Sequence, residues 1–408
     1  MGESLINEQI DDYDTSSSPA ILDLPDDCLI KIFSFLEIAE KLKVEGVCKR
    51  WYRISKRGWP DVESLSLTCR DFGGNIKQAT RILRRSGRLL KSLRIEVNSQ
   101  MSIYQKVLQK HCPHIRKIEL IFNCWAFRSV LKTHSKNLSA LFPSLKKIDW
   151  LVMMHVNEEV GNRQLKALPE RLQGLEITGS WVYAISCPFS ANIVRFPNLR
   201  VLSLNNFIIE KESLSGFEKL ENLTALDLSF CHVPDESIRK IQLFSRLEKL
   251  ELKRKAIEGL DPSSIHDDHI CEIVEGCPKL RDLKLDGLES LSNLSFRAIS
   301  TLKHLETLHM ENLPRVTSRA ITNQLQVQNL NCSHCPGIDN EGLNVLIQNS
   351  QNLVHLKAQG TADMSSFLQS ASEAIKFRNK NSQLTLDVGD SLNSWQRPEN
   401  FSPLILLI

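Results

Sequence analysis

The sequence predicts an α/β protein in which a short N-terminal module of three helices precedes a solenoid, with a curved parallel sheet inside and helices or irregular segments outside. Two observations predict this architecture. Apolar residues near the N-terminus recur at helical spacing, and the rest of the chain repeats one short apolar unit at a nearly constant interval. The 408 residues are 42% hydrophobic and 24% charged, which is typical of a chain that folds around a large core.

Residues 1–20 form an acidic, Ser-rich segment without Lys or Arg. Because it lacks apolar periodicity, it cannot offset its ordering entropy, and we expect it to be disordered. It also lacks the features of a signal peptide, and the chain contains no run of eighteen apolar residues. We therefore expect a cytoplasmic and/or nuclear protein that does not enter a membrane. The 11 cysteines follow no framework, which favours reduced thiols.

Residues 21–60 have the pattern of three short helices. Pro25 suits the first turn of a helix, where a missing N–H is tolerated, and Asp26 and Asp27 complement the positive end of the helix dipole. An apolar stripe with helical spacing is formed by Leu29, Ile32, Phe33 and Leu36. Two further helical stretches surround Leu42 and Trp51. Three such helices bury little apolar surface alone, so we expect the module to pack against a neighbour or a partner.

The segment LPDDCLIKIFSFLEIAEKLKVEGVCKRWYRIS, residues 24–55, resembles an F-box. The resemblance lies in the opening Leu24-Pro25, the apolar stripe and the run Val47-Cys48-Lys49-Arg50-Trp51, with Trp59 where the family often ends its motif. Within the family, LKVEGVCKRWYR is most similar to the S-phase-kinase-associated member. One departure is Lys41-Leu42, which stands in place of the usual Asp-Leu of the second helix.

The resemblance implies docking on the Skp adaptor, which in turn holds a cullin scaffold. The positions that would carry this docking are Leu24, Pro25, Leu29, Ile32, Phe33, Leu36, Val47, Cys48 and Trp51. An apolar stripe with a Trp anchor is also the composition of a binding hot spot, whatever the family. Some of these residues must instead pack the three helices together, and the sequence does not divide the two groups.

After Trp59 the unit apolar-x-x-apolar-x-apolar occurs twelve times. The central residues of these units are Leu65, Leu93, Ile118, Ile148, Leu175, Leu202, Leu226, Leu250, Leu283, Leu308, Leu330 and Leu356. Their mean spacing of about 26 residues is in the range of leucine-rich repeats, and the alternation predicts a short strand in each unit. We expect a leucine-rich-repeat solenoid of about 12–13 repeats over residues 61–390, with a degenerate thirteenth unit at Leu384-Thr385-Leu386. Residues 391–408 form a tail that caps the last repeat or folds back along the inner surface.

The middle residue of each predicted strand is expected to face the concave side of the solenoid. We take as candidate substrate-binding residues Glu119, Asp149, Glu176, Asp227, Glu251, Lys284 and His309. Five of the six middle residues in units three to eight are acidic, which favours a protein substrate with a basic segment. The alternative is that these are ordinary polar residues at exposed strand positions.

Three other clusters have both a functional and a structural interpretation. Residues 257–270 include Asp261, His266, Asp267, Asp268 and His269. This set suits either a metal site or, as we expect, a solvated loop. The stretch from Lys77 to Arg94 contains seven bases and no acid. It either docks an acidic partner or forms a solvated outer helix. Because no aromatic residues are interleaved with the bases, we do not expect it to bind nucleic acid. Cys332 and Cys335 form a lone CxxC pair, which favours buried thiols.

The sequence contains no nucleophile with a partnered base and no phosphate-cradling Gly loop, so we expect no enzymatic activity, no metal and no cofactor. The leading hypothesis is a substrate-recognition subunit of a Skp-cullin-F-box (SCF) ubiquitin ligase, which binds the adaptor through the F-box and a protein substrate through the concave face. The substrate would then be ubiquitinated and degraded by the proteasome. The alternative is a non-degradative leucine-rich-repeat interaction scaffold, and a third class is an enzyme inhibitor of the same repeat type.

Overall fold

The computed structural model of the protein describes residues 21–59, 62–68, 75–97, 101–122, 147–156, 165, 168–179, 185–187, 193–209, 216–254, 265–322, 325–361, 364–378, 383–389, 398 and 401–408. The segment predicted to be disordered, residues 1–20, lies outside the described residues, as does Asp261.

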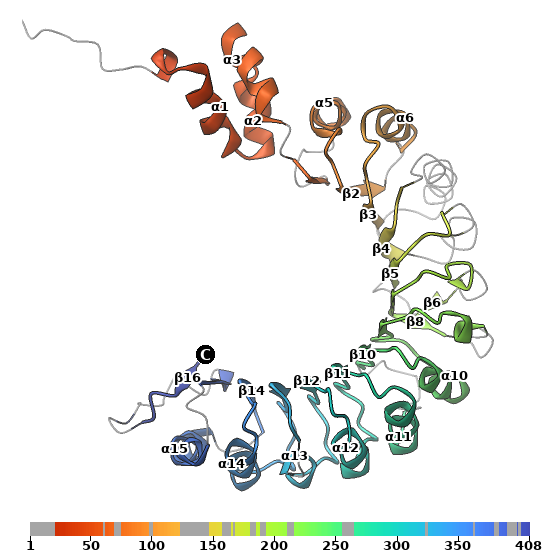
Figure 1. Ribbon diagram of the computed structural model, residues 1–408, viewed down its shortest axis with the longest axis vertical. Helices are drawn as coiled ribbons and strands as arrows, with labels where there is room; N and C mark the ends of the chain where they lie inside the picture. Colours follow the sequence, from red (N-terminus) through yellow and green to blue (C-terminus); the bar gives the residue numbers. More distant parts are fainter. Residues whose placement is uncertain are drawn as a thin grey trace, which may run out of the picture.

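The chain forms an open arc with strands along the inner side and helices along the outer side (Figure 1). A helical module stands at the N-terminal end of the arc. Its elements are η1 (Ile21–Asp23), α1 (Asp26–Ser34), α2 (Ile38–Val44), α3 (Lys49–Ser55) and η2 (Lys56–Gly58). The second helix begins three residues before Lys41, and the Glu37 N–H donates to Glu40 Oε2 at 3.1 Å near its start. The contact between Glu37 and Glu40 therefore marks the start of α2. Lys41, which replaces the usual Asp of the family motif, lies inside this helix and not at its start.

Among the described residues, fourteen strands form one parallel sheet in chain order, and β6 and β8 pair separately. The sheet strands are β1 (Ser64–Leu67), β2 (Ser92–Val97), β3 (Lys117–Phe122), β4 (Trp150–Val156), β5 (Gly174–Gly179), β7 (Val201–Asn205), β9 (Ala225–Asp227), β10 (Lys249–Glu251), β11 (Asp282–Lys284), β12 (Thr307–His309), β13 (Asn329–Asn331), β14 (His355–Lys357), β15 (Leu384–Asp387) and β16 (Ile405–Leu407). The separate pair is β6 (Ile185–Ser186) and β8 (Phe207–Ile208).

The helices described on the outer side of the arc are α-helices or short stretches of 3₁₀-helix (Figure 1). They are α5 (Ile76–Ser86), α6 (Met101–His111), η5 (Phe217–Lys219), α10 (Asp235–Arg239), η6 (Lys240–Leu243), α11 (Asp267–Gly276), α12 (Asn293–Ile299), α13 (Arg319–Thr322), α14 (Asn340–Asn349), α15 (Met364–Ala374) and η7 (Ile375–Phe377). The predicted fold class, N-terminal helices followed by a solenoid with a long parallel sheet, is confirmed.

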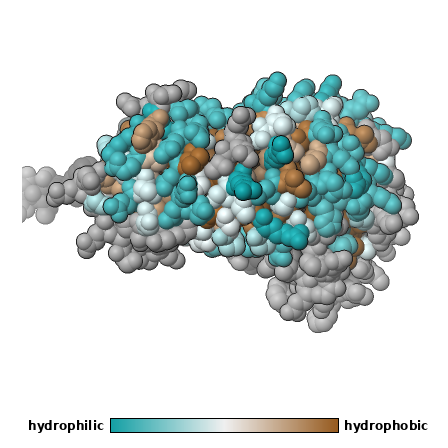
Figure 2. All heavy atoms as spheres, turned by 90° about the horizontal axis from the view of Figure 1, so that it is seen from below, coloured by the Kyte–Doolittle hydropathy of each residue, from teal (hydrophilic) through white to brown (hydrophobic). Residues whose placement is uncertain are grey.

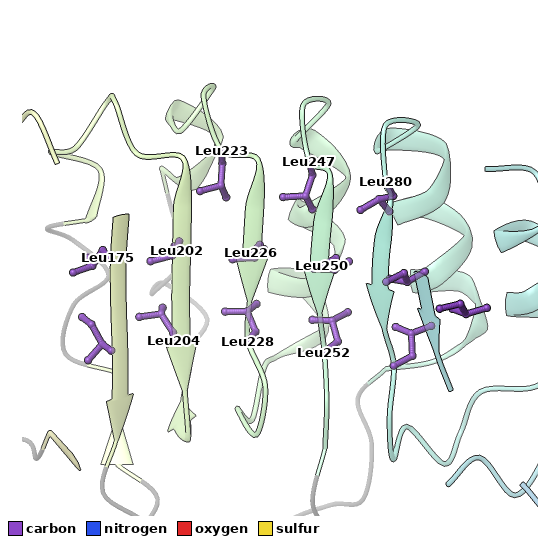
Figure 3. Close-up of a cluster of buried hydrophobic side chains, with 14 of the residues drawn as sticks. Leu175, Leu202, Leu204, Leu223, Leu226, Leu228, Leu247, Leu250, Leu252 and Leu280 are labelled. Carbon is purple, nitrogen blue, oxygen red and sulfur yellow. The ribbon is translucent and has the colours of Figure 1, made fainter. Parts of the chain in front are cut away.

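The core of the solenoid lies between the sheet and the outer segments and runs from Trp59 to Ile405 as one cluster. Leucines at equivalent positions stand side by side in neighbouring strands, as Leu202, Leu226 and Leu250 do (Figure 3). All three are at most 1% exposed, and burying each such side chain contributes about 2 kcal/mol. Since each leucine is covered by its neighbours in the adjacent repeats, stability depends on stacking rather than on any single repeat.

The fourth predicted unit is wrong by three residues. The sequence indicated Leu145/Ile148/Trp150 with Asp149 in the middle, whereas the register pairs Ile118 with Leu151 and Glu119 with Val152. Because Ile148, Leu151 and Met153 satisfy the same apolar template, the pattern alone fits both alignments. Asp149 therefore precedes β4, and Val152 occupies the concave position that we predicted for Asp149.

The C-terminal residues extend the sheet. Strand β15 pairs with β14 so that Leu386 lies beside Leu356, and β16 adds a final parallel strand beside β15. We expected the tail either to cap the last repeat or to fold back along the inner surface. Ile405–Leu407 form an edge strand next to the last repeat, which corresponds to the first arrangement.

The outer surface of the lower part of the arc is mainly hydrophilic, with only isolated hydrophobic residues among those described (Figure 2). On the outer segments η6 and η7, Leu243 and Phe377 are 57% and 70% exposed. Such scattered apolar side chains are normal on a protein surface. None of the described helices combines the length and the apolar character needed to cross a membrane.

Candidate functional site

The N-terminal helical module has a small core of its own. Leu29 and Phe33 of α1 and Ile54 of α3 are at most 2% exposed and pack together. The Trp51 ring meets the Phe33 ring edge to face, with the ring centroids 5.1 Å apart. Leu24, Leu36 and Trp51 are partly buried against the same core. Leu29 and Phe33, which we predicted to bind an adaptor, therefore hold the module together instead of facing a partner.

A second apolar stripe on α1 remains exposed beside the first. It consists of Cys28, Ile32 and Phe35, spaced i, i+4 and i+7, and we call it the α1 stripe. Ile32 is 39% exposed and Phe35 is 77% exposed. Sequence reasoning found Ile32 but missed Cys28 and Phe35, although their helical spacing was the available signal. An exposed aromatic residue at the end of an amphipathic helix is suited to contact a partner.

The loop before α3 exposes two more of the predicted residues. Val47 is 58% exposed, and Cys48 is also exposed at the N-cap of α3, where its Sγ accepts a hydrogen bond from the Trp51 N–H at 3.4 Å. Pro25, likewise predicted, is exposed just before α1. These residues and the α1 stripe are among the exposed apolar side chains through which the module can meet another protein.

Arg50 fastens the start of α1 to α3. Its Nε and Nη2 donate to Asp26 Oδ1 at 3.0 and 2.8 Å, and its Nη2 also donates to the Leu24 carbonyl at 2.6 Å. Charge-assisted contacts of this kind are stronger than neutral ones. Arg50 thus fixes the turn that carries Leu24 and Pro25, a role that its place in the motif did not reveal.

The helical module is joined to the solenoid by a buried polar contact. Trp59 is 1% exposed within the core of the solenoid, and its Nε1 donates to Glu45 Oε1 at 3.1 Å. The Glu45 side chain is fully buried and forms ion pairs with Arg81 and Arg85 of α5. Two of the seven bases in the stretch predicted as a docking surface or solvated helix, Arg81 and Arg85, therefore contact the helical module. A buried carboxylate that accepts hydrogen bonds from Trp59 and Arg81 and forms an ion pair with Arg85 fixes the module relative to the first repeat.

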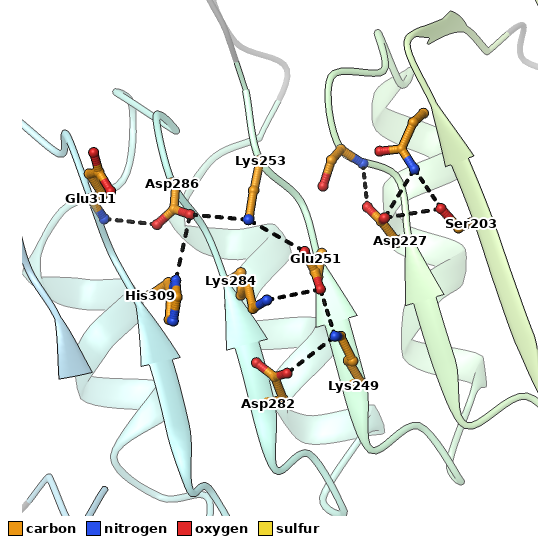
Figure 4. Close-up of polar contacts among 12 residues, drawn as sticks. Ser203, Asp227, Lys249, Glu251, Lys253, Asp282, Lys284, Asp286, His309 and Glu311 are labelled. Carbon is orange, nitrogen blue, oxygen red and sulfur yellow. Dashed lines mark hydrogen bonds and ion pairs between the residues drawn. The ribbon is translucent and has the colours of Figure 1, made fainter. Parts of the chain in front are cut away.

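The concave face carries most of the predicted column, and its acidic side chains have partners within the protein (Figure 4). Glu119 pairs with Arg94 at 3.2 Å, and Glu176 accepts from Trp150 Nε1 at 2.6 Å. Asp227 accepts hydrogen bonds from Ser203 and Asn205, both at 3.0 Å. The predicted acidic strip is thus largely neutralised or hydrogen-bonded, which weakens the expectation of a substrate with a basic segment.

Glu251 is the clearest case on the concave face. Lys249 and Lys284 approach Glu251 Oε1 at 2.8 and 3.1 Å, and Lys253 approaches Oε2 at 3.6 Å (Figure 4). Burial alone would raise the pKa of the Glu251 carboxyl, but the hydrogen bonds and charges of Lys249 and Lys284 outweigh burial and lower the pKa to about 2. Glu251 and Lys284, both predicted to bind substrate, therefore stabilise neighbouring strands.

Replacing Glu251 by Gln is expected to lower the unfolding free energy at pH 7 by about 2 to 3 kcal/mol. A carboxyl with a lowered pKa in the folded state stabilises the fold above its ordinary pKa of 4.5, and this contribution is lost as the pH falls toward about 2. Urea unfolding between pH 7 and pH 3 should show the difference from the unsubstituted protein shrinking below pH 4.5. Glu306→Gln is the control, because its pair with Arg281 is exposed. A pH-independent difference would contradict the assignment.

His309 lies farther along the concave face. Its Nδ1 is 4.0 Å from Asp286 Oδ2, and burial lowers the pKa of His309 while raising the pKa of Asp286. A pocket of about 270 Å³ opens beside it over the last strands, with Asn331, Lys357 and Ile408 in its lining. His309 is therefore the predicted substrate-binding residue that also lines a concave pocket.

The remaining clusters have structural roles in the described part of the chain. Asp267 at the start of α11 accepts hydrogen bonds from the hydroxyls of Ser292 and Ser295, and His269 Nε2 lies 2.6 Å from Asp235 Oδ1. These residues tie α11 to the outer segments on either side of it. Asp267 and His269 belong to helix α11, whereas we had expected a solvated loop.

The CxxC cysteines, Cys332 and Cys335, are fully buried free thiols. Burial raises the pKa of both, that of Cys335 to about 11, and the Cys335 thiol donates to the Met310 carbonyl at 3.0 Å. At neutral pH both are protonated, so neither is suited to bind a metal or act as a nucleophile.

These observations define a class of protein: a solenoid that presents a concave sheet and carries, in fixed orientation, a small helical module with exposed apolar residues. Residues 21–59 match the protein family described as F-box-like. The match covers the module from η1 to Trp59, so the module is an F-box-like domain.

The chain is also similar to a solved structure described as the crystal structure of the Rad7 and Elc1 complex in yeast. The sequence identity is 14%, the match covers 94% of this chain and 92% of that chain, and the TM-score is 0.46. The assignment of the helical module rests on the F-box-like match.

Proposed function

We propose that this protein is the substrate-recognition subunit of a Skp-cullin-F-box ubiquitin ligase. The F-box-like domain binds the Skp adaptor, and through it the cullin scaffold, while the leucine-rich-repeat solenoid holds a protein substrate for ubiquitination and proteasomal degradation. The observation that carries the proposal is the F-box-like domain at residues 21–59, with apolar side chains exposed on α1 and before α3. The protein itself is non-catalytic and acts in the cytoplasm and/or nucleus.

The fixed joint between the domain and the solenoid supports this role. Trp59 and Glu45 connect the two parts through contacts with each other and with Arg81 and Arg85 of α5 at the buried Glu45 carboxylate. A rigid connection keeps a bound substrate at a defined distance from the ligase, which raises the effective concentration of its lysines near the charged ubiquitin-conjugating enzyme. A freely swinging domain would lose part of this advantage.

The proposal is tested by co-purification from cells. The tagged protein is expected to retain both the Skp adaptor and a cullin, whereas Val47→Asp should lose both, because an aspartate in an apolar interface loses its hydration without gaining a partner. The matched control is Leu243→Asp, since Leu243 is 57% exposed on the outer surface, close to the 58% of Val47. The control should retain both partners.

Other outcomes separate this proposal from the alternatives. Retention of the adaptor without any cullin would favour the non-degradative scaffold. Equal retention of cullin by Val47→Asp and by its control would contradict the role of this loop in docking. Proximity labelling with and without a proteasome inhibitor then identifies substrates, because degraded partners accumulate only when the proteasome is blocked.

A further inference from the structure

A basic pocket lies at the edge of the sheet where strands β2 to β5 begin. Its volume is about 470 Å³. The basic side chains that line it are Arg88, Lys91, His114, Arg116, Lys147 and Arg171. Leu89 is the remaining lining residue and is 48% exposed. We call this feature the basic rim pocket.

The parallel sheet gathers these residues from four repeats. Lys91 and Arg116 directly precede β2 and β3, while Lys147 and Arg171 stand three residues before β4 and β5. Strands in one parallel sheet begin at the same edge and lie about 4.8 Å apart. Four adjacent strands therefore span about 14 Å along the rim, the length of roughly four residues of an extended peptide.

The pocket has more positive charge than its neighbours neutralise. Lys91 pairs with Glu63 at 2.6 Å, and Arg116 pairs with Asp149 at 3.1 Å. The side chains of both ion pairs are exposed or partly exposed to solvent. No carboxylate of the described residues lies within 4.0 Å of Arg88, Lys147 or Arg171. The Lys147 Nζ instead lies 3.4 Å from His114 Nδ1. Several donors thus converge without an acidic partner, which is an arrangement suited to an anionic ligand.

We propose that the basic rim pocket binds a phosphorylated segment of the protein substrate. The inference rests on the proposed receptor function and names the chemistry by which the substrate is chosen. Arginine guanidinium groups match phosphate oxygens in bidentate geometry, and Leu89 offers apolar contact to a neighbouring side chain of the peptide. The predicted acidic residues of the concave face already have partners, whereas Arg88, Lys147 and Arg171 of the rim have no acidic partner among the described residues.

The pocket favours a phosphorylated peptide over a nucleic acid. Its described lining contains no Phe, Tyr or Trp, so it offers no platform on which bases can stack. Its span of about 14 Å matches one or two phosphates on a short segment and falls short of the groove that follows a nucleic-acid backbone. The peptide phosphates carry nearly two negative charges each at pH 7.

The test uses the full chain purified with its adaptor and a defined probe. The probe is a fluorescein-labelled Gly/Ser peptide with two phosphoserines two residues apart, and binding is followed by fluorescence anisotropy at about 150 mM salt, where distant charges are screened. The pocket variant combines Arg88→Glu, Lys147→Glu and Arg171→Glu. The matched control reverses three exposed bases elsewhere, Lys219→Glu, Lys303→Glu and Arg315→Glu. A milder variant, Lys147→Gln with Arg171→Gln, tests the pocket with a smaller change in case the triple charge reversal disturbs folding.

We expect the unsubstituted protein and the control to bind the phosphorylated probe equally. The pocket variant should bind at least about tenfold more weakly because it loses charge-assisted contacts, with an intermediate loss for the milder variant. The unphosphorylated peptide should not bind. Equal weakening in the control, or no binding of the probe to the unsubstituted protein, would overturn the proposal. So would oligothymidine of equal charge that competes better than the phosphopeptide.

Adaptor retention, measured on the same preparations, separates the two proposals. The pocket variant should keep the adaptor, which also shows that it is folded. Phosphopeptide binding by a protein that holds neither adaptor nor cullin would leave the pocket assignment standing and remove the ligase role. If the protein retains the adaptor and the cullin but does not bind the phosphopeptide, the ligase role would stand and the pocket assignment would be removed.

Discussion

Phe35→Asp is expected to weaken binding of the purified Skp adaptor by about 100-fold. Phe35 ends the α1 stripe and is 77% exposed, so the substitution removes an aromatic anchor with little effect on the packing of the module. Loss of an aromatic hot-spot residue typically costs 2 to 4 kcal/mol, and an aspartate adds the cost of desolvating a charge. Isothermal titration calorimetry with the adaptor measures the change in Kd.

The matched control for this variant is Phe377→Asp. Phe377 is 70% exposed at the other end of the solenoid, so the same chemical change occurs at a similar exposure but far from the F-box-like domain. The control should bind the adaptor with unchanged affinity. A loss below about threefold for Phe35→Asp, with circular dichroism unchanged, would remove the α1 stripe from the adaptor interface.

Trp59→Ala is expected to lower the unfolding free energy by about 3 to 5 kcal/mol, because the indole is 1% exposed and its removal leaves a large cavity. It also removes the donor to Glu45, the residue of the F-box-like domain whose carboxylate pairs with Arg81 and Arg85 of α5. Hydrogen exchange should therefore increase most in α2, α5 and β1, since a solenoid loosens locally around the altered repeat.

Trp59→Phe serves as the comparison for this variant. Phenylalanine retains much of the apolar burial but donates no hydrogen bond, so we expect a loss of about 1 to 2 kcal/mol. Urea unfolding of the three proteins, together with exchange rates for α14 as a distant reference, checks the result. Exchange that rises equally in α14 and α5 would show a global effect and contradict the local role of this joint.

Particular residues show how far sequence reasoning reached. The alternation around Leu226 and Leu250 predicted strands that the structure places side by side, because one apolar residue in the middle of each unit must be covered by its neighbours. The same reasoning misplaced the fourth unit, where Ile148, Leu151 and Met153 repeat the pattern three residues later. On α1, one apolar stripe was predicted, and the helix carries two, of which one is core and the other exposed.

The sequence by itself determined the fold class and the position of the F-box-like segment, because hydrophobic periodicity and short motifs are properties of neighbouring residues along the chain. The tertiary structure alone decided which polar side chains have partners. Glu251 meets Lys284 from the next repeat, and Glu45 meets Arg81 across the joint. It also brought Arg88 and Arg171 to one pocket. The physical reason is that pairing of charges depends on the register between strands and on the path of the loops, neither of which a repeat pattern specifies.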